Sequence, residues 1–87
     1  MKISTKGRYA LRILADIAEH GVEKNVPIRE IAERQGFSDK YLEGIVSRLS
    51  SAGLVKSGRG KYGGYRLVKD PAEYNVYEIL YAAEDSI

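Results

Sequence analysis

The 87-residue sequence contains no cysteine and no tryptophan, and it has a single histidine. Without thiols the chain cannot form a disulfide or a thiolate-held iron–sulfur cluster. One histidine without a cluster of other ligands does not make a zinc site, and no nucleophile–base pair is apparent. We therefore expect no cofactor and no enzymatic activity.

Long hydrophobic runs are also absent. No apolar run exceeds five residues, whereas a membrane-spanning helix needs about 20. The opening residues 1–6 lack the apolar core and the cleavage site of a signal peptide. The sequence therefore predicts a cytoplasmic protein that does not associate with membranes.

Positive charge is concentrated in two blocks. Residues 1–12 carry four Lys or Arg and residues 46–69 carry six, in both cases without an acid, although the net charge of the chain is only +2. The intervening and final stretches are net acidic. If the fold brings the two basic blocks together, they form the footprint expected of a nucleic-acid-binding face.

Apolar periodicity predicts three helices within the first 51 residues. The first spans 8–20, with Arg12, Asp16 and Glu19 on its polar side; the second follows Pro27 and stops at Gly36. The third is expected from its N-cap Ser38 to residue 51, with Gly53 closing it.

A Gly-rich basic hairpin follows. Two β-prone runs, 54–57 and 65–68, flank a tip with four glycines, one arginine and one lysine. After an Asp70-Pro71 turn, Asn75 and Glu78 form a capping box for a last helix. The predicted fold is an α+β winged helix-turn-helix (three helices, a two-stranded wing hairpin and a C-terminal helix) in a single domain over residues 1–87.

This layout assigns each element to one part of duplex DNA. The third helix enters the major groove N-terminus first, and its candidate contacts are Ser38, Asp39, Lys40, Tyr41, Glu43, Gly44 and Ser47. Glycine inside that helix permits close approach of DNA or is simply tolerated. The wing candidates are Arg59, Gly60, Lys61 and Tyr62, with Arg59 between small neighbours, as suits a narrow A·T-rich minor groove. Arg48 and Arg66 are candidates for the phosphate backbone.

Two features of the sequence admit another interpretation. Residues 58–63 match the G-x-G-x-x-G dinucleotide fingerprint, but a strand follows instead of the required helix, which excludes nucleotide binding. A winged helix can also serve as a protein–protein interaction module. The last helix is apolar on two sides, and its second face, with Tyr74, Tyr77 and Tyr81, indicates a dimer interface or a missing C-terminal segment.

Three stretches, residues 1–10, 31–43 and 52–65, closely resemble the Rrf-two family of bacterial winged-helix regulators, which includes IscR, NsrR and the cysteine-metabolism repressor CymR. The basic start and the cysteine-free hairpin look most like the CymR side. The resemblance implies a homodimeric transcription regulator, usually a repressor, that binds an inverted repeat. It also implies that Ser4, Thr5, Lys6 and Arg8 grip the DNA backbone.

The chain departs from the family pattern at two points. Family members commonly carry Gln at the position of Gly44, so a major-groove contact is expected to differ here. Family chains also continue into a long dimerisation helix, through which a regulatory protein or small-molecule effector would act. We expect this segment, and the cluster-binding cysteines of some members, to be absent from the present chain.

Overall fold

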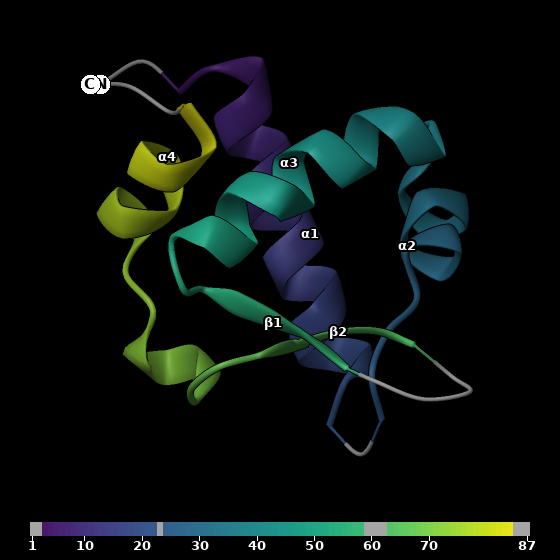
Figure 1. The fold of residues 1–87 in the computed structure, drawn as a ribbon. Helices are drawn as coiled ribbons and strands as arrows, with labels where there is room; N and C mark the ends of the chain where they lie inside the picture. Colours follow the sequence, from purple (N-terminus) through teal and green to yellow (C-terminus); the bar gives the residue numbers. More distant parts are fainter. Residues whose placement is uncertain (1–2, 23, 59–62, 85–87) are drawn as a thin grey trace.

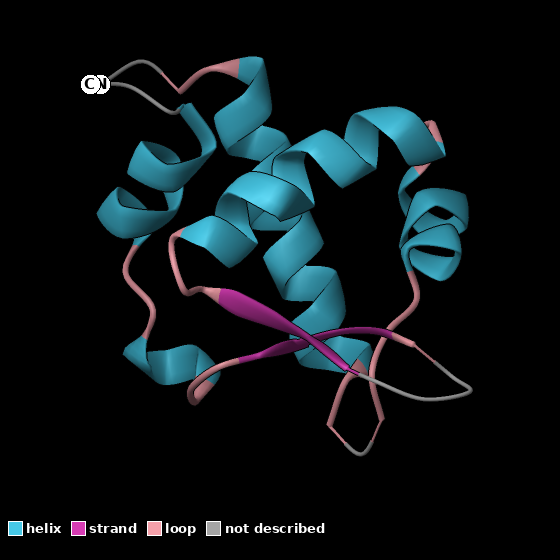
Figure 2. Cartoon of the chain, viewed as in Figure 1, coloured by secondary structure: helices cyan, strands magenta, loops and turns pink. Residues whose placement is uncertain are grey.

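Four helices and one antiparallel hairpin make up the chain in a computed structural model that describes residues 3–22, 24–58 and 63–84 (Figure 1). In chain order the elements are α1 (Thr5–His20), α2 (Ile28–Gln35), α3 (Asp39–Ser51), β1 (Val55–Gly58), β2 (Gly64–Leu67), a short 3-10 helix η1 (Pro71–Glu73) and α4 (Val76–Glu84). The helices gather on one side and the hairpin lies along their edge (Figure 2). This order confirms the predicted winged helix-turn-helix.

Side-chain caps explain where three of the helices begin. Ser38 Oγ accepts a hydrogen bond from the Tyr41 N–H at 3.2 Å, as predicted. Asn75 and Glu78 form the predicted capping box, each side chain accepting from the other residue's N–H at 3.0 and 3.1 Å. Helix α1 begins earlier than expected because Ser4 Oγ accepts from the Gly7 N–H at 3.0 Å. The apolar stripe starts only at Ala10 and therefore did not reveal this polar first turn.

The core is built around α1 and α3. Ile13 and Ile17 of α1 and Leu42, Val46 and Leu49 of α3 are almost fully buried, and each contributes about 1.5–3 kcal/mol by leaving water. Helix α4 packs beside the start of α1, where a Cβ at Gly7 would lie 2.7 Å from the Leu80 side chain. These contacts join the two ends of the described chain in one core.

The hairpin pairs Val55 with Leu67 and Gly58 with Gly64. Compared with the predicted 54–57 and 65–68, β1 lies one residue later and β2 one residue earlier. Val68 is not part of β2, since its N–H bonds to the Tyr74 hydroxyl at 2.9 Å instead of to a strand. A third segment joins at the outer edge of β2. Val26 exchanges two backbone hydrogen bonds with Tyr65, at 2.8 and 2.9 Å, although the sequence predicted only a loop before Pro27.

The predicted tyrosine face of the last helix is wrong for Tyr74. It lies before α4, and its hydroxyl donates to the Leu54 carbonyl at 2.6 Å while accepting from the Val68 N–H. Tyr74 therefore ties the segment before α4 to the base of the hairpin, where Leu54 precedes β1 and Val68 follows β2. Tyr77 and Tyr81 do lie on the outer side of α4, where they are 72% and 61% exposed, next to the exposed Val76.

Candidate nucleic-acid interface

The outer face of α3 carries every major-groove candidate. The buried side of this helix consists of Leu42, Ile45, Val46 and Leu49. The candidates, Ser38, Asp39, Lys40, Tyr41, Glu43, Gly44 and Ser47, are all exposed. Fold and burial thus leave one continuous polar side of α3 accessible to a large ligand.

The turn between α2 and α3 fixes the angle at which α3 is presented. Gly36 adopts φ +77°, and the N–H groups of Gly36 and Phe37 both bond to the Ala32 carbonyl, at 2.8 and 3.1 Å. A left-handed residue at this position ends α2 and redirects the chain within two residues. Ser38 then starts α3 at once.

An aromatic cluster joins α1 to the start of α3. The Tyr9 ring lies 4.2 Å from the Phe37 ring and 5.6 Å from the Tyr41 ring, measured between centroids. The Arg12 guanidinium lies over both Tyr9 and Phe37, and its Nε donates to Gln35 Oε1 at 3.1 Å. Tyr41 therefore packs at about a right angle to the Tyr9 ring, and Arg12 of the first basic block braces the turn.

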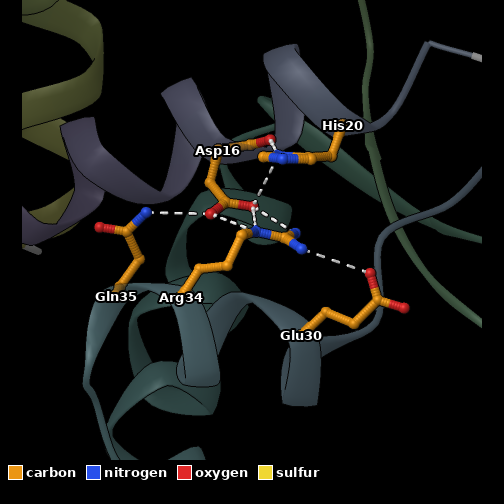
Figure 3. Close-up of polar contacts among 5 residues, drawn as sticks. All are labelled: Asp16, His20, Glu30, Arg34 and Gln35. Carbon is orange, nitrogen blue, oxygen red and sulfur yellow. Dashed lines mark hydrogen bonds and ion pairs between the residues drawn. The ribbon is translucent and has the colours of Figure 1, made fainter.

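A buried carboxylate ties α1 to α2 (Figure 3). Asp16 is 3% exposed and accepts from Arg34 Nη2 at 2.8 Å, from Arg34 Nε at 3.0 Å and from Gln35 Nε2 at 2.9 Å. Burial by itself raises the pKa of Asp16. The hydrogen bonds from Arg34 and Gln35, together with the charges of Arg34 and His20, outweigh burial, so the pKa is lowered.

The sequence pattern does not predict this network, because it assigns Asp16 to the polar side of the first helix. The end of α2 covers that side and supplies both partners, so the carboxylate is enclosed. The available signal was its position at helical spacing from Ile13, directly before Ile17, at the edge of the buried stripe. Asp16 holds α2, and with it the turn into α3, against α1.

The candidates from the first basic block lie in the first two turns of α1. Thr5, Lys6 and Arg8 are exposed. Ser4 is half-buried: its hydroxyl caps α1 and also hydrogen-bonds to the Glu84 carboxylate at the end of α4. The start of a helix carries a partial positive charge that favours anions, and here the Glu84 carboxylate lies at that start, beside the three exposed candidates.

The wing candidates Arg59, Gly60, Lys61 and Tyr62 lie outside the described residues. The two strands at the base of the wing, β1 and β2, are described. In the sequence Gly58 is only a small neighbour of Arg59, whereas the structure shows what lies beside it within the chain. A Cβ at Gly58 would overlap the Asn25 side-chain amide, so the absence of a side chain at Gly58 leaves room for Asn25 beside the hairpin. Arg66 is exposed on β2, and Arg48 is half-buried on α3.

Gly44 has no packing reason to be glycine. A Cβ built there meets no heavy atom within 4 Å. Gly44→Ala is therefore expected to raise the free energy of unfolding by about 1 kcal/mol, because alanine loses less backbone freedom in a helix. Urea unfolding measures this change; an unaltered or lower stability would contradict it. Loss of DNA affinity in the same variant would favour close approach of DNA over plain tolerance.

The part of the chain that the structure describes contains neither a cluster of metal ligands nor a membrane-spanning helix. Within residues 3–22, 24–58 and 63–84 no three metal-binding side chains gather at one place. None of the helices in these ranges is both long and apolar enough to cross a bilayer.

Comparison with known proteins decides the family. The model of the Rrf2 family, described as "Iron-dependent Transcriptional regulator", matches residues 3–87. The chain belongs to the Rrf2 family. It is 47% identical over 87 residues to the HTH-type transcriptional regulator IscR of Photorhabdus laumondii, covering all of this chain and 53% of that protein. It is 45% identical over 85 residues to Protein rrf2 of Nitratidesulfovibrio vulgaris, covering 98% of this chain and 57% of that protein.

Solved structures of this family have the same fold. CymR of B. subtilis, titled the global cysteine regulator, superposes with a TM-score of 0.90 at 44% identity, over all of this chain and 67% of that one. IscR of T. potens gives 0.86 at 45% identity, over 94% of this chain and 60% of that one. The expected likeness to the CymR side in particular stays a prediction. The IscR relative of Photorhabdus laumondii is named as a transcriptional regulator, and the chain spans about half the length of the curated relatives that it matches.

Proposed function

We propose that this chain is a sequence-specific double-stranded DNA-binding domain of a transcription regulator. The observation that carries the proposal is the exposed polar face of α3, the second helix of a tight helix-turn-helix, which together with the N-cap Ser38 contains all seven candidates. Membership of a family of named transcriptional regulators supports it. Residues 1–87 act as one domain, and control is by repression at an inverted repeat.

Each candidate has a proposed role. The N-cap Ser38 and the exposed side of α3 face the major groove, where Glu43 accepts from a cytosine amino group. Arg59, with Gly60, Lys61 and Tyr62, enters the minor groove. The phosphate backbone is held by cationic and hydroxyl groups of three elements: Ser4, Thr5, Lys6, Arg8, Arg48 and Arg66.

The proposed partners follow from the family and from α4. The regulator acts in the cytoplasm as a homodimer, because an inverted repeat matches a two-fold protein. The exposed Val76, Tyr77 and Tyr81 offer an apolar surface for contact between proteins. A regulatory protein or a small-molecule effector acts through a segment beyond this chain.

Selection of the chain on a random duplex library at two salt concentrations tests the proposal. We expect an enriched inverted repeat with A·T-rich flanks, and affinity that falls with salt at a log–log slope of about −0.9 per phosphate contacted. Binding without a motif would contradict sequence specificity in this chain. No retention at either salt would contradict DNA binding and favour a protein-interaction module.

Glu43→Ala is expected to change base preference at one position by about 1–3 kcal/mol and to leave overall affinity nearly unchanged. Glu43 is exposed on α3 and makes no ion pair within the described ranges. Selection with the variant measures the change, and Glu19→Ala on the exposed side of α1 is the matched control. A site identical to that of the parent chain would remove Glu43 from the base-reading residues.

A further inference from the structure

Asn25 lies at the base of the wing, although no part of the winged-helix layout assigns it a role. The next residue, Val26, is hydrogen-bonded in both directions to Tyr65 of β2. This pairing holds the Asn25–Val26 segment against the outer edge of the hairpin. From there Asn25 Oδ1 accepts a hydrogen bond from Arg66 Nε at 3.0 Å.

The same segment packs against both stems of the wing. Gly58 and Gly64 are paired across the hairpin, one where the chain leaves β1 and the other where it enters β2. A side chain at Gly58 would overlap the Asn25 amide, and a Cβ at Gly64 would lie 2.5 Å from the Val26 carbonyl carbon. Two glycines thus leave room for residues 25 and 26 where the wing begins and ends.

The charges around Arg66 favour an amide over a carboxylate at position 25. Lys56 stands directly opposite Arg66 in the hairpin, so two cations share one cross-strand position. Like charges in this arrangement repel each other. A neutral carbonyl oxygen can orient the guanidinium without cancelling its charge, whereas a carboxylate would neutralise a charge proposed to meet phosphate.

We propose that Asn25 is a positioning residue for DNA binding, which fixes the Arg66 guanidinium and the base of the wing while leaving their positive charge intact. This inference rests on the proposed function, because it assigns Arg66 to the phosphate backbone. Asn25 itself does not touch DNA. Its removal acts through Arg66.

Salt-dependent binding tests this role. The full 87-residue chain and its variants are titrated onto a labelled random-sequence duplex at several salt concentrations. Arg66→Ala is expected to reduce the magnitude of the log–log salt slope by about 0.9, the loss of one phosphate contact. Asn25→Ala should weaken binding by about threefold to tenfold and reduce the slope similarly, and the double variant should be no worse than Arg66→Ala.

A second variant separates positioning from folding. Asn25→Asp keeps the shape of the side chain and the acceptor oxygen, so it should unfold at the temperature of the parent chain or above it. Its DNA binding should nevertheless weaken, with a lower slope, because the carboxylate pairs with Arg66. Val22→Ala, in the same connection and 82% exposed, is the control expected to change neither property.

The outcomes are distinct. Parent-like affinity in Asn25→Asp, or effects of Asn25→Ala and Arg66→Ala that simply multiply, would overturn the positioning role while DNA binding stands. A parent chain without salt-sensitive binding to duplex DNA would overturn the proposed function and this inference together.

Discussion

Asp16→Ala is expected to lower the free energy of unfolding by about 3 kcal/mol. Removing one partner of a buried ion pair leaves the other charge without compensation, at a cost of about 3–5 kcal/mol. The lower end applies because the Arg34 side chain is 32% exposed, so its guanidinium can regain water, and because Glu30 lies within 3.6 Å of it. Gln35 loses its acceptor as well.

Urea unfolding of the parent chain and variant measures this loss. Glu30→Ala is the matched control, since it removes the other carboxylate beside Arg34, one that is 40% exposed. Surface pairs contribute about 0–1 kcal/mol, and the control should stay within that range. Equal effects of the two substitutions would show that Asp16 behaves as a surface charge, contrary to its burial.

The same contact makes stability depend on pH. The pKa of Asp16 is lowered in the folded chain, so the unfolded chain takes up a proton at higher pH than the folded one. The stabilisation is fully present above the ordinary carboxyl pKa of about 4 and disappears as pH falls through the lower folded value. Hydrogen bonding to the Asn75 N–H and to Lys69 also lowers the pKa of Glu78, which adds the same acid sensitivity to the parent chain and to any variant at Asp16.

Thermal unfolding of the parent chain and Asp16→Asn between about pH 6 and pH 2 isolates the Asp16 contribution. The asparagine variant keeps the shape of the side chain and the response of Glu78. The gap between the two melting temperatures should therefore narrow below about pH 4. A gap that stays constant through this range would contradict the assigned pKa direction.

Gly64→Ala is expected to lower the free energy of unfolding by about 4 kcal/mol, combining backbone strain with overpacking. Gly64 has φ +145°, and a methyl group there would meet the backbone of Val26 at 2.5 and 2.6 Å and the Pro27 nitrogen at 2.7 Å. Backbone atoms cannot rotate aside as the end of a flexible side chain can. The substitution should therefore separate Val26 from Tyr65 and break both hydrogen bonds between them.

Gly53→Ala is the matched control for strain alone. Gly53 has φ +78°, and a Cβ there meets no heavy atom within 4 Å. Its alanine variant should lose only about 1–2 kcal/mol, the cost of a left-handed conformation. Comparable losses at the two glycines, measured by urea unfolding, would contradict the close packing of residue 26 against the hairpin.

Most of the local structure follows from local patterns. The stripe of Leu42, Ile45, Val46 and Leu49 and the cap at Ser38 predicted α3 and its exposed face correctly, because a helix places residues three and four apart on one side. The capping box of Asn75 and Glu78 likewise predicted the start of α4 correctly. Helix α1 was predicted too short at its start, since its first turn is polar and depends on a single cap from Ser4.

The sequence alone was therefore sufficient to predict the order of the elements, the face that α3 presents, and the two stretches of chain in which positive charge is concentrated. Tertiary structure alone decided three things: the burial of Asp16 under α2, the use of Arg12 as a brace, and the pairing of Val26 with the wing. Each depends on contacts between residues at least 18 positions apart in the chain, made by side chains in the first two cases and by the backbone in the third. Periodicity within one helix or strand carries no information on such meetings, because they depend on how separate elements pack together.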